Sequence, residues 1–411
     1  MTLPNLLPDV TCWNMDGEPR KHFRLYTSNR LEVLIEALAE ILRAPVASPF
    51  DPEIILVQSK GMERWIAMEL ARRHGIAAHF RFPFPNRFVY DQVFRSVMAD
   101  LPEASPFDRE VMTWKIMRLL TPLLDRPEFE QLRNYLKNDR GRLRRYQLAV
   151  RIADLFDQYL VFRPEMIFDW ENRQRENGWQ SILWRQLTAE SESPHRAALG
   201  RMLFERLQND SAVAEQLPER ISVFGITTLP HFHLQVLDEI SKHRPVNLFL
   251  LNPCADYWGD ILSNRERRRT LRRGREKGWS EAELHLGEEN GLLTSMGMQG
   301  RDFFDMITEY YTDEFDGFED PGEATLLSCI QSDILFRRNR PSRRIDKRIL
   351  AHEDDSIQIH LCHSPMREIE ILHDRLLDLF QTDGTLLPRD VLVMASDIET
   401  YGPYIQAVFD R

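Results

Sequence analysis

The spacing of apolar residues along the chain separates strand-like from helix-like regions. Residues 23–42 (FRLYTSNRLEVLIEALAEIL) begin with a short apolar run, continue through a polar turn at 27–30, and end with apolar residues every three or four positions. This pattern predicts a strand, a turn and an amphipathic helix. A second apolar run at 53–57 (EIILV) precedes a helix that we expect to end at Gly75. Strand, helix, strand and helix in succession indicate a parallel α/β sheet.

The pattern changes in the middle of the chain and then returns. Residues 106–215 have helical periodicity almost throughout, most clearly at 145–162 (RYQLAVRIADLFDQYLVF). Buried-strand runs reappear at 220–226 (RISVFGI) and 246–251 (VNLFLL), with a helix after Pro230 between them. An α/β domain interrupted by a helical insertion explains this order. Periodicity alone leaves open whether the two α/β parts share one sheet.

The last part of the chain starts a new alternation. Residues 357–363 (IQIHLCH) alternate as a strand, 366–380 have helical spacing, and 390–396 (DVLVMAS) are typical of a buried strand. We therefore expect a fragment of a longer protein, with a second α/β domain present only in part. The predicted domains are an extension at 1–22, an α/β domain at 23–105 and 216–350, a helical insertion at 106–215, and the start of a second α/β domain at 351–411.

The turn Thr27-Ser28-Asn29-Arg30 stands where many ATP-driven enzymes have their phosphate loop. Such a loop needs glycines whose backbone N–H groups surround the phosphates, a Lys for the β/γ-phosphates, and a Ser or Thr for Mg²⁺. The turn has neither glycine nor Lys, so we interpret Ser28 or Asn29 as the N-cap of the following helix. The acidic Mg²⁺ residue is missing too, because the strand at 220–226 continues into Thr227 and Thr228.

We find no catalytic constellation in the sequence. There is no Ser-His-Asp elbow, and His231 and His233 after Pro230 fit a helix start or a surface position better than a metal-binding pair. We therefore expect no catalytic residue, no cofactor and no metal in this chain. A working ATPase with an unrecognised site is the alternative.

Composition and charge narrow the function classes. No apolar run approaches the roughly 20 residues of a membrane span, and the acidic N-terminus is unlike a secretory signal. Four cysteines without any CxxC favour the reducing cytosol over a disulfide framework or zinc site. The net charge of −11 is unusual for a nucleic-acid binder, but it is unevenly distributed. Basic blocks at 265–277 and 337–348 and an acidic block at 309–323 are typical of solvated loops, or of a binding edge for DNA or a partner chain.

Two further segments have side chains suited to unpaired DNA. Residues 80–95 (FRFPFPNRFVYDQVFR) interleave aromatic residues with arginines, which stack on bases and meet phosphates respectively, although a core-packing loop is the alternative. The helix at 145–162 presents Asp154, Asp157 and Gln158 opposite its apolar side. This polar side is either a solvated face or, in a DNA path, a set of groups that accept hydrogen bonds from base amino groups.

Long stretches of the chain, taken together, resemble the RecC family, the gamma chain of the exodeoxyribonuclease V (RecBCD) helicase-nuclease. They run in family order from about residue 24 to 411 and include LYTSNRLEVL, ILVQSKGMERWIAMEL, GIAAHFRFPFP, ADLFDQYLVFRP, NPCADYWGDI, IQSDIL, CHSPMREIEILHDRLLDLF and PRDVLVMASDIETYGPYIQAVF. The resemblance implies a superfamily 1 helicase-like (P-loop NTPase-like) parallel sheet with a decayed ATP site. It also implies a subunit that joins RecB-like and RecD-like motors in a heterotrimer and guides the 3′-ended strand. ATP and Mg²⁺ are then used by the partners.

The resemblance also implies residues that read the recombination hotspot Chi as single-stranded DNA. These are Gln58, Lys60, Arg64, Phe84, Tyr90, Asp154, Leu155, Asp157, Gln158, Arg163 and Arg196. Lys60, Arg64, Phe84 and Tyr90 depart from the residue types of better-known members. We therefore expect a different Chi sequence, because Lys and Arg add phosphate or guanine affinity.

We therefore predict a cytoplasmic, non-catalytic DNA-binding subunit of a helicase-nuclease that acts in recombinational repair of double-strand breaks. A purely structural adaptor that touches partner subunits but not DNA is the other alternative. In active helicases of this superfamily the second strand-to-helix turn touches single-stranded DNA, and here that turn is Gln58-Ser59-Lys60-Gly61.

Overall fold

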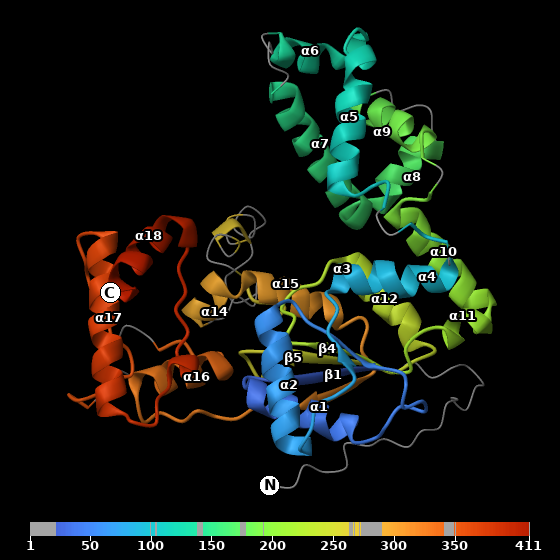
Figure 1. Ribbon diagram of the computed structural model, residues 1–411. Coiled ribbons are helices and arrows are strands. Elements are labelled where there is room, and N and C mark those ends of the chain that lie inside the picture. The colour runs from blue at the N-terminus through green and yellow to red at the C-terminus, as the bar shows by residue number, and fades with distance from the viewer. Residues whose placement is uncertain are drawn as a thin grey trace. The chain divides into compact units, whose positions relative to one another are not determined.

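The structure is a computed structural model that describes most of the chain (Figure 1). The described residues are 22–98, 100–102, 105–137, 143–172, 178–191, 193–262, 266, 268–270, 272, 290–340, 349 and 351–410. They form two compact units, one up to residue 320 together with 331–341, the other comprising 321–330 and the residues from 342. Residues 1–21 of the proposed extension at 1–22, and most of the two basic blocks, lie outside the described residues.

The first unit is built on a six-stranded sheet with the order β3-β2-β4-β5-β1-β6. Its strands are β1 (Phe23–Ser28), β2 (Glu53–Leu56), β3 (Phe80–Arg81), β4 (Ile221–Phe224), β5 (Val246–Leu251) and β6 (Asp313–Asp316). Every neighbouring pair is parallel, with Phe23 opposite Val246 and Ile54 opposite Ile221. The predicted α/β class with a parallel sheet is therefore confirmed. Strands from before and after the inserted helices belong to this one sheet.

Successive residues of each central strand face two different cores, because side chains alternate across a strand. Phe23, Leu25 and Val223 belong to one core, whereas Tyr26 and Phe224 belong to the other. Helices α1 (Leu31–Leu42) and α2 (Lys60–His74) cover the Tyr26 side. Helix α12 (His231–Ser241) and parts of α10 (Arg196–Asn209) and α11 (Ser211–Glu215) cover the opposite side. Coverage on both faces explains why these strands read as continuous apolar runs.

The predicted end of α2 agrees with the structure, whereas the predicted N-cap of α1 does not. Gly75 ends α2 in the left-handed conformation, at a φ of 81°, as its position predicted. The N-cap of α1, however, is Arg30, and it makes no side-chain capping bond. The interpretation of Ser28 or Asn29 as this cap is therefore wrong. Their side chains bind a distant segment instead, as described below.

Buried residues from Phe107 to Ala197 form a core separate from those of the sheet, and a group of helices occupies the chain between β3 and β4. The helices of this group are α3 (Pro85–Phe88), the π-helix η1 (Val89–Val93), α4 (Phe94–Val97), α5 (Arg109–Leu123), η2 (Pro127–Phe129), α6 (Glu130–Leu136), α7 (Leu143–Phe162), α8 (Pro164–Asn172), α9 (Trp179–Ala189), α10 (Arg196–Asn209) and α11 (Ser211–Glu215). Phe156 and Trp184 pack edge to face at the centre of this core, 5.3 Å between ring centroids. Glu171 accepts hydrogen bonds from Trp184 Nε1 (3.0 Å) and pairs with His195 Nε2 (2.9 Å), which joins α8, α9 and the start of α10.

The remaining elements follow β5. They are α14 (Gly291–Met296), α15 (Met298–Ile307), α16 (Leu326–Leu335), α17 (Pro365–Thr382), η4 (Pro388–Asp390) and α18 (Ile398–Phe409). The helix predicted at 366–380 is confirmed as α17. Among the described residues, no helix has the length and hydropathy needed to cross a membrane.

Two strand assignments from the sequence are wrong, and two strands of the sheet were not predicted. The runs at 357–363 and 390–396 are not strands here, and Leu361 and Leu392 are 95% and 80% exposed. A strand needs a neighbouring strand to pair with, and none of the described residues provides one at these runs. In contrast, β3 and β6 were not predicted. β3 has only two residues, and β6 (DEFD) is part of the acidic block, whose charges suit an edge strand.

Candidate nucleic-acid interface

The turn after β1 is closely engaged by the segment that follows β6. Thr27 Oγ1 donates to Asp316 Oδ1 (2.6 Å), and Ser28 Oγ donates to the carbonyl of Gly317 (2.7 Å). Asn29 makes a reciprocal pair with Glu319, donating through Nδ2 to its carbonyl (2.8 Å) and accepting from its backbone N–H at 3.0 Å. The polar side chains of this turn are therefore satisfied from within the chain.

The packing at this turn leaves little room for a phosphate group. A Cβ atom at Gly317 would lie 2.6 Å from Cγ1 of Val33, so the segment after β6 runs directly against the start of α1. The backbone N–H of Arg30 donates to Ser28 Oγ (3.0 Å), whereas a phosphate loop directs such groups at its ligand. A phosphate at this turn would have to displace the segment at 316–319.

Packing also accounts for the missing acidic residue after β4. Gly225 follows the strand with a φ of 63°, a conformation that favours glycine. A Cβ at this position would meet Cε of Met62, on α2, at 3.1 Å. An Asp in this conformation would be strained and would push against α2. The glycine therefore serves the close approach of β4 and α2.

The second turn is organised differently from the first. Ser59 is the N-cap of α2 and accepts from the backbone N–H of Met62 (3.1 Å), so Lys60 and Gly61 belong to the first helical turn and not to a loop. Gln58 donates through Nε2 to the carbonyl of Thr228 (3.1 Å). These two contacts fix where the helix starts and how it is directed.

Two cations project from this start of α2. Lys60 is 79% exposed and pairs with Glu63 at 2.8 Å, a contact that solvent weakens. Arg64 is exposed and makes no hydrogen bond or ion pair with the part of the chain that the structure describes. Their charge adds to the partial positive charge of the helix N-terminus, which favours a nearby anion.

Phe84 and Tyr90 occupy different environments in the segment 80–95. Phe84 precedes α3 and is 40% exposed. Tyr90 is half-buried, packs edge-on to Phe94 (6.4 Å between centroids) and donates its hydroxyl to the carbonyl of Pro102 at 3.2 Å. This burial raises the pKa of Tyr90. The core-packing alternative thus applies to Phe88 and Phe94, which are fully buried, and not to Phe84.

The candidate residues of α7 form a connected set. Asp154 pairs with Arg109 of α5 (3.1 Å) and accepts from Gln158 Nε2 at 3.0 Å. Asp157 faces Arg196 of α10, with 3.5 Å between Oδ1 and Nη1. Burial raises the pKa of the Asp157 carboxyl, and the Arg196 guanidinium opposes this effect. These pairings hold the carboxylates in place on the surface of the helical group.

Leu155 and Arg163 complete the α7 set. Leu155 is half-buried, one position after Asp154. Arg163 follows the last residue of α7, is exposed, and stacks over the ring of Tyr159 at 5.9 Å. A guanidinium held against an aromatic ring keeps its donors free for a phosphate or a base edge.

The structure brings some of these residues together in one pocket. Tyr90 and Arg196, far apart in the sequence, line a pocket of about 610 Å³ together with Asn86, Arg87, Asp91, Arg95 and Asp108. Asp154 lines a different pocket, beside Arg109. Sequence reasoning missed Asp108 and Arg109. Only the fold shows that the start of α5 lies against α7, because no motif marks that position.

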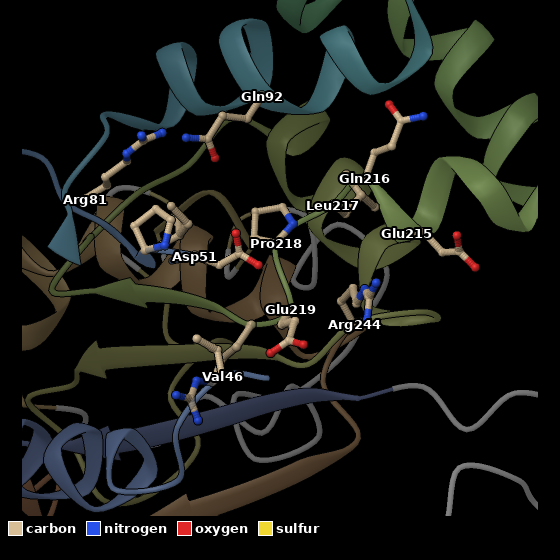
Figure 2. A pocket seen from close by; sticks show the side chains of 13 residues that line it. Val46, Asp51, Arg81, Gln92, Glu215, Gln216, Leu217, Pro218, Glu219 and Arg244 are labelled. Atoms are coloured by element: carbon tan, nitrogen blue, oxygen red, sulfur yellow. The ribbon is translucent and has the colours of Figure 1, made fainter. Parts of the chain in front are cut away.

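A third pocket, shown in Figure 2, lies at the amino ends of strands β2 and β4. Its volume is about 420 Å³, and its lining includes Asp51 before β2 and Arg220 before β4. Arg220 pairs with Glu53 and donates to the carbonyls of Ile41 (2.8 Å) and Ala44 (3.0 Å). Ligands of open parallel sheets bind beyond the carboxyl ends of the strands. This pocket at the amino ends is therefore not the counterpart of a nucleotide site.

The two histidines after Pro230 have separate roles. His231 is the first residue of α12, and its Nε2 lies 2.8 Å from the hydroxyl of Tyr310. His233 is buried, so the surface alternative does not apply to it. Within the described ranges, no group of three or more His, Cys, Asp or Glu side chains is arranged to hold a metal ion.

Comparisons with known proteins all find similarity to one protein family. The family model "RecC, N-terminal domain" matches residues 23–337. The RecBCD enzyme subunit RecC of Escherichia coli (strain K12) is 41% identical over 94% of this chain and 38% of its own length. The corresponding proteins of Haemophilus influenzae and Mycolicibacterium smegmatis are 36% and 33% identical, over 95% and 94% of this chain and 39% and 34% of their own lengths. The chain thus spans well under half of these relatives.

Proposed function

Because this chain belongs to the RecC family, we propose that it is the non-catalytic DNA-guiding part of a RecBCD-type helicase-nuclease. In this role it joins RecB-like and RecD-like subunits in a heterotrimer, guides the 3′-ended single strand, and takes part in recombinational repair of double-strand breaks in the bacterial cytoplasm. The relatives are named as subunits of the RecBCD enzyme, and that name supports the partners. We also propose that the parallel sheet is a superfamily 1 helicase-like one.

The contrast between the two strand-to-helix turns carries this proposal. At the first turn, Ser28 and Asn29 are bonded to the segment after β6. At the second, Lys60 and Arg64 project from a helix N-terminus. The chain therefore presents anion-binding groups where a helicase-like sheet would meet DNA, and closes the place where it would meet ATP. The partners accordingly supply ATP hydrolysis and Mg²⁺, and this chain binds no cofactor.

The DNA contacts that we propose divide into two kinds. Lys60, Arg64, Arg163 and Arg196 provide cationic donors for phosphates or guanine edges. Asp154 and Asp157 are fixed by arginine partners, so they accept hydrogen bonds from base amino groups without a large cost in repulsion. The other proposed contacts are Gln58, Phe84, Tyr90, Leu155 and Gln158. We propose that this set recognises a Chi sequence different from that of better-known members.

Binding of labelled single-stranded DNA, followed by fluorescence anisotropy across a salt series, tests the proposal. The logarithm of the binding constant falls by about 0.7 per phosphate contact for each tenfold increase in salt. Replacing both Lys60 and Arg64 by Ala should therefore weaken binding and reduce this slope by about 1.4. Arg72→Ala, at the other end of the same helix and 72% exposed, is the matched control and should change neither. Absence of DNA binding at low salt would favour the structural adaptor.

Calorimetric titration with Mg²⁺-ATP addresses the alternative of a working ATPase. We expect no heat of binding at micromolar nucleotide, since the turn at 27–30 is bonded to residues 316–319. Micromolar binding by this chain would show that our interpretation of the turn is wrong.

A further inference from the structure

An exposed aromatic pair lies on the helical group, beside the candidate residue Asp154. Trp114 of α5 is 64% exposed and Tyr146 of α7 is 40% exposed, and their ring centroids are 5.6 Å apart at an angle of 43°. Both line the pocket of about 600 Å³ that also contains Arg151 and Asp154. Singly exposed aromatic residues are common, but two exposed rings in contact at the rim of a pocket form a contiguous apolar patch that marks a candidate binding site.

This pair is continuous with the proposed DNA contacts on α7. Tyr146, Val150, Asp154 and Gln158 are spaced by four residues, so they follow one side of the helix at intervals of about 6 Å. Gln158 and Asp154 are directly hydrogen bonded. Any strand that contacts these two residues and continues toward the start of α7 therefore passes Val150 and reaches the aromatic pair.

The charges around the pair suit a nucleotide. Arg151 is exposed and makes no ion pair or hydrogen bond within the described part of the chain. Arg109 is 65% exposed even though it pairs with Asp154. Aromatic rings stack on unpaired bases, and nearby guanidinium groups meet the adjoining phosphates. The carboxylate of Asp154 remains available to accept from a base amino group.

The same charges argue against a protein partner. The centres of protein–protein interfaces are depleted of charged residues. Here four of the eight lining residues are charged, namely Arg109, Glu110, Arg151 and Asp154. A protein side chain buried against Trp114 would have to desolvate these groups, whereas a nucleotide can use them.

We propose that the pocket formed by Trp114 and Tyr146 stacks an unpaired base of single-stranded nucleic acid, extending the binding path along α7 beyond Asp154. This inference rests on the proposed function. It adds a subsite that takes any base, because every base offers a π face to the rings. Arg151 contacts a phosphate next to that base.

Alanine substitution measures the stacking. Stacking on one aromatic residue contributes about 1–3 kcal/mol, so Trp114→Ala and Tyr146→Ala should each weaken binding of single-stranded DNA about fivefold or more. Trp114→Phe should recover most of the loss because it keeps a ring. Tyr135→Ala on α6, where Tyr135 is 52% exposed, is the matched control and should leave the affinity unchanged. Since all these side chains are exposed, equal melting temperatures are expected and confirm that the variants fold.

Crosslinking locates the contact directly. Oligonucleotides carrying 5-iodouracil, irradiated in complex with the whole protein, should crosslink to Trp114 or Tyr146, and the crosslink should disappear in the corresponding Ala variant. The inference is overturned if the wild type binds DNA, Trp114→Ala binds it with unchanged affinity, and no such crosslink forms. The proposed function would still stand in that case. Loss of a partner subunit from purified Trp114→Ala complex, with DNA affinity intact, would assign the pocket to protein binding and also overturn it. Failure of the wild-type protein to bind DNA would instead contradict the proposed function itself.

Discussion

Acid should destabilise the first unit through His233, which is buried on α12 against the ring of Phe232. Burial, together with the nearby Arg196 guanidinium, lowers the pKa of His233 from 6.5 to about 4. The folded protein therefore holds the ring neutral. Because the folded pKa lies below the unfolded one, the stabilisation is complete above pH 6.5 and is lost as the pH falls toward 4.

The size of the effect follows from the two pKa values. At pH 5 the unfolded ring is protonated and the folded ring is still neutral. The loss of stability therefore corresponds to the interval of about 1.5 pH units between pH 5 and the unfolded pKa of 6.5. At 1.36 kcal/mol per unit this amounts to about 2 kcal/mol relative to neutral pH, and it approaches about 3 kcal/mol near pH 4. Replacement by Gln removes the titration but keeps a polar side chain of similar size.

Urea unfolding of the wild type and His233→Gln at pH 7 and pH 5 provides the measurement. No tryptophan occurs after residue 320, so tryptophan fluorescence reports on the first unit. The wild type should lose about 2 kcal/mol more than the variant between the two pH values, whereas carboxylates affect both proteins equally. His352→Gln, at an exposed position, should behave as the wild type does. Equal losses in wild type and His233→Gln would refute the reasoning.

Three further substitutions test the packing around the sheet, each by urea unfolding. Arg220→Ala leaves the largely buried Glu53 carboxylate, which is 14% exposed, without its ion-pair partner and should cost about 3–5 kcal/mol. Arg43→Ala removes an exposed ion pair and should cost under about 1 kcal/mol, so similar losses in the two variants would contradict this account. Gly225→Ala forces a side chain into the left-handed region and should cost about 1–2 kcal/mol, so an unchanged midpoint would show that φ relaxes there. Asn29→Ala removes two exposed hydrogen bonds to the segment after β6 and should cost about 1 kcal/mol; a neutral result would mean that water replaces them.

The buried strands of the sheet could be predicted because each carries its own signal. β2 and β5 are apolar on both faces, and Gly75 marks a helix end by itself. β6 has no such signal, since its acidic side chains alternate between intermediate and exposed positions at a sheet edge. The runs at 357–363 and 390–396 show the reverse case. They have strand composition, but composition does not supply a pairing partner.

The parts of the candidate site that could be predicted are those whose residues lie in one continuous segment. The polar start of α2 follows directly from the residues around Lys60. The pairing of Asp154 with Arg109 joins two helices, and the pocket shared by Tyr90 and Arg196 joins parts of the chain that no local pattern relates. The wrong N-cap assignment has the same cause. Ser28 is a good capping residue, but its hydroxyl binds Gly317, 289 positions away.

The place of β1 in the sheet determines how long this strand must wait for its neighbours during synthesis. β1 is made among the first described residues, yet its two neighbours are β5 and β6, and Thr27 bonds to Asp316. At translation rates of about 5–20 residues per second, β1 waits about 15–60 s for β6 to emerge from the ribosome. The α5–α9 helices have a core of their own and complete it earlier. During that interval one edge of the apolar β1 lacks its neighbour, and unpaired strand edges in incompletely folded chains are prone to aggregation.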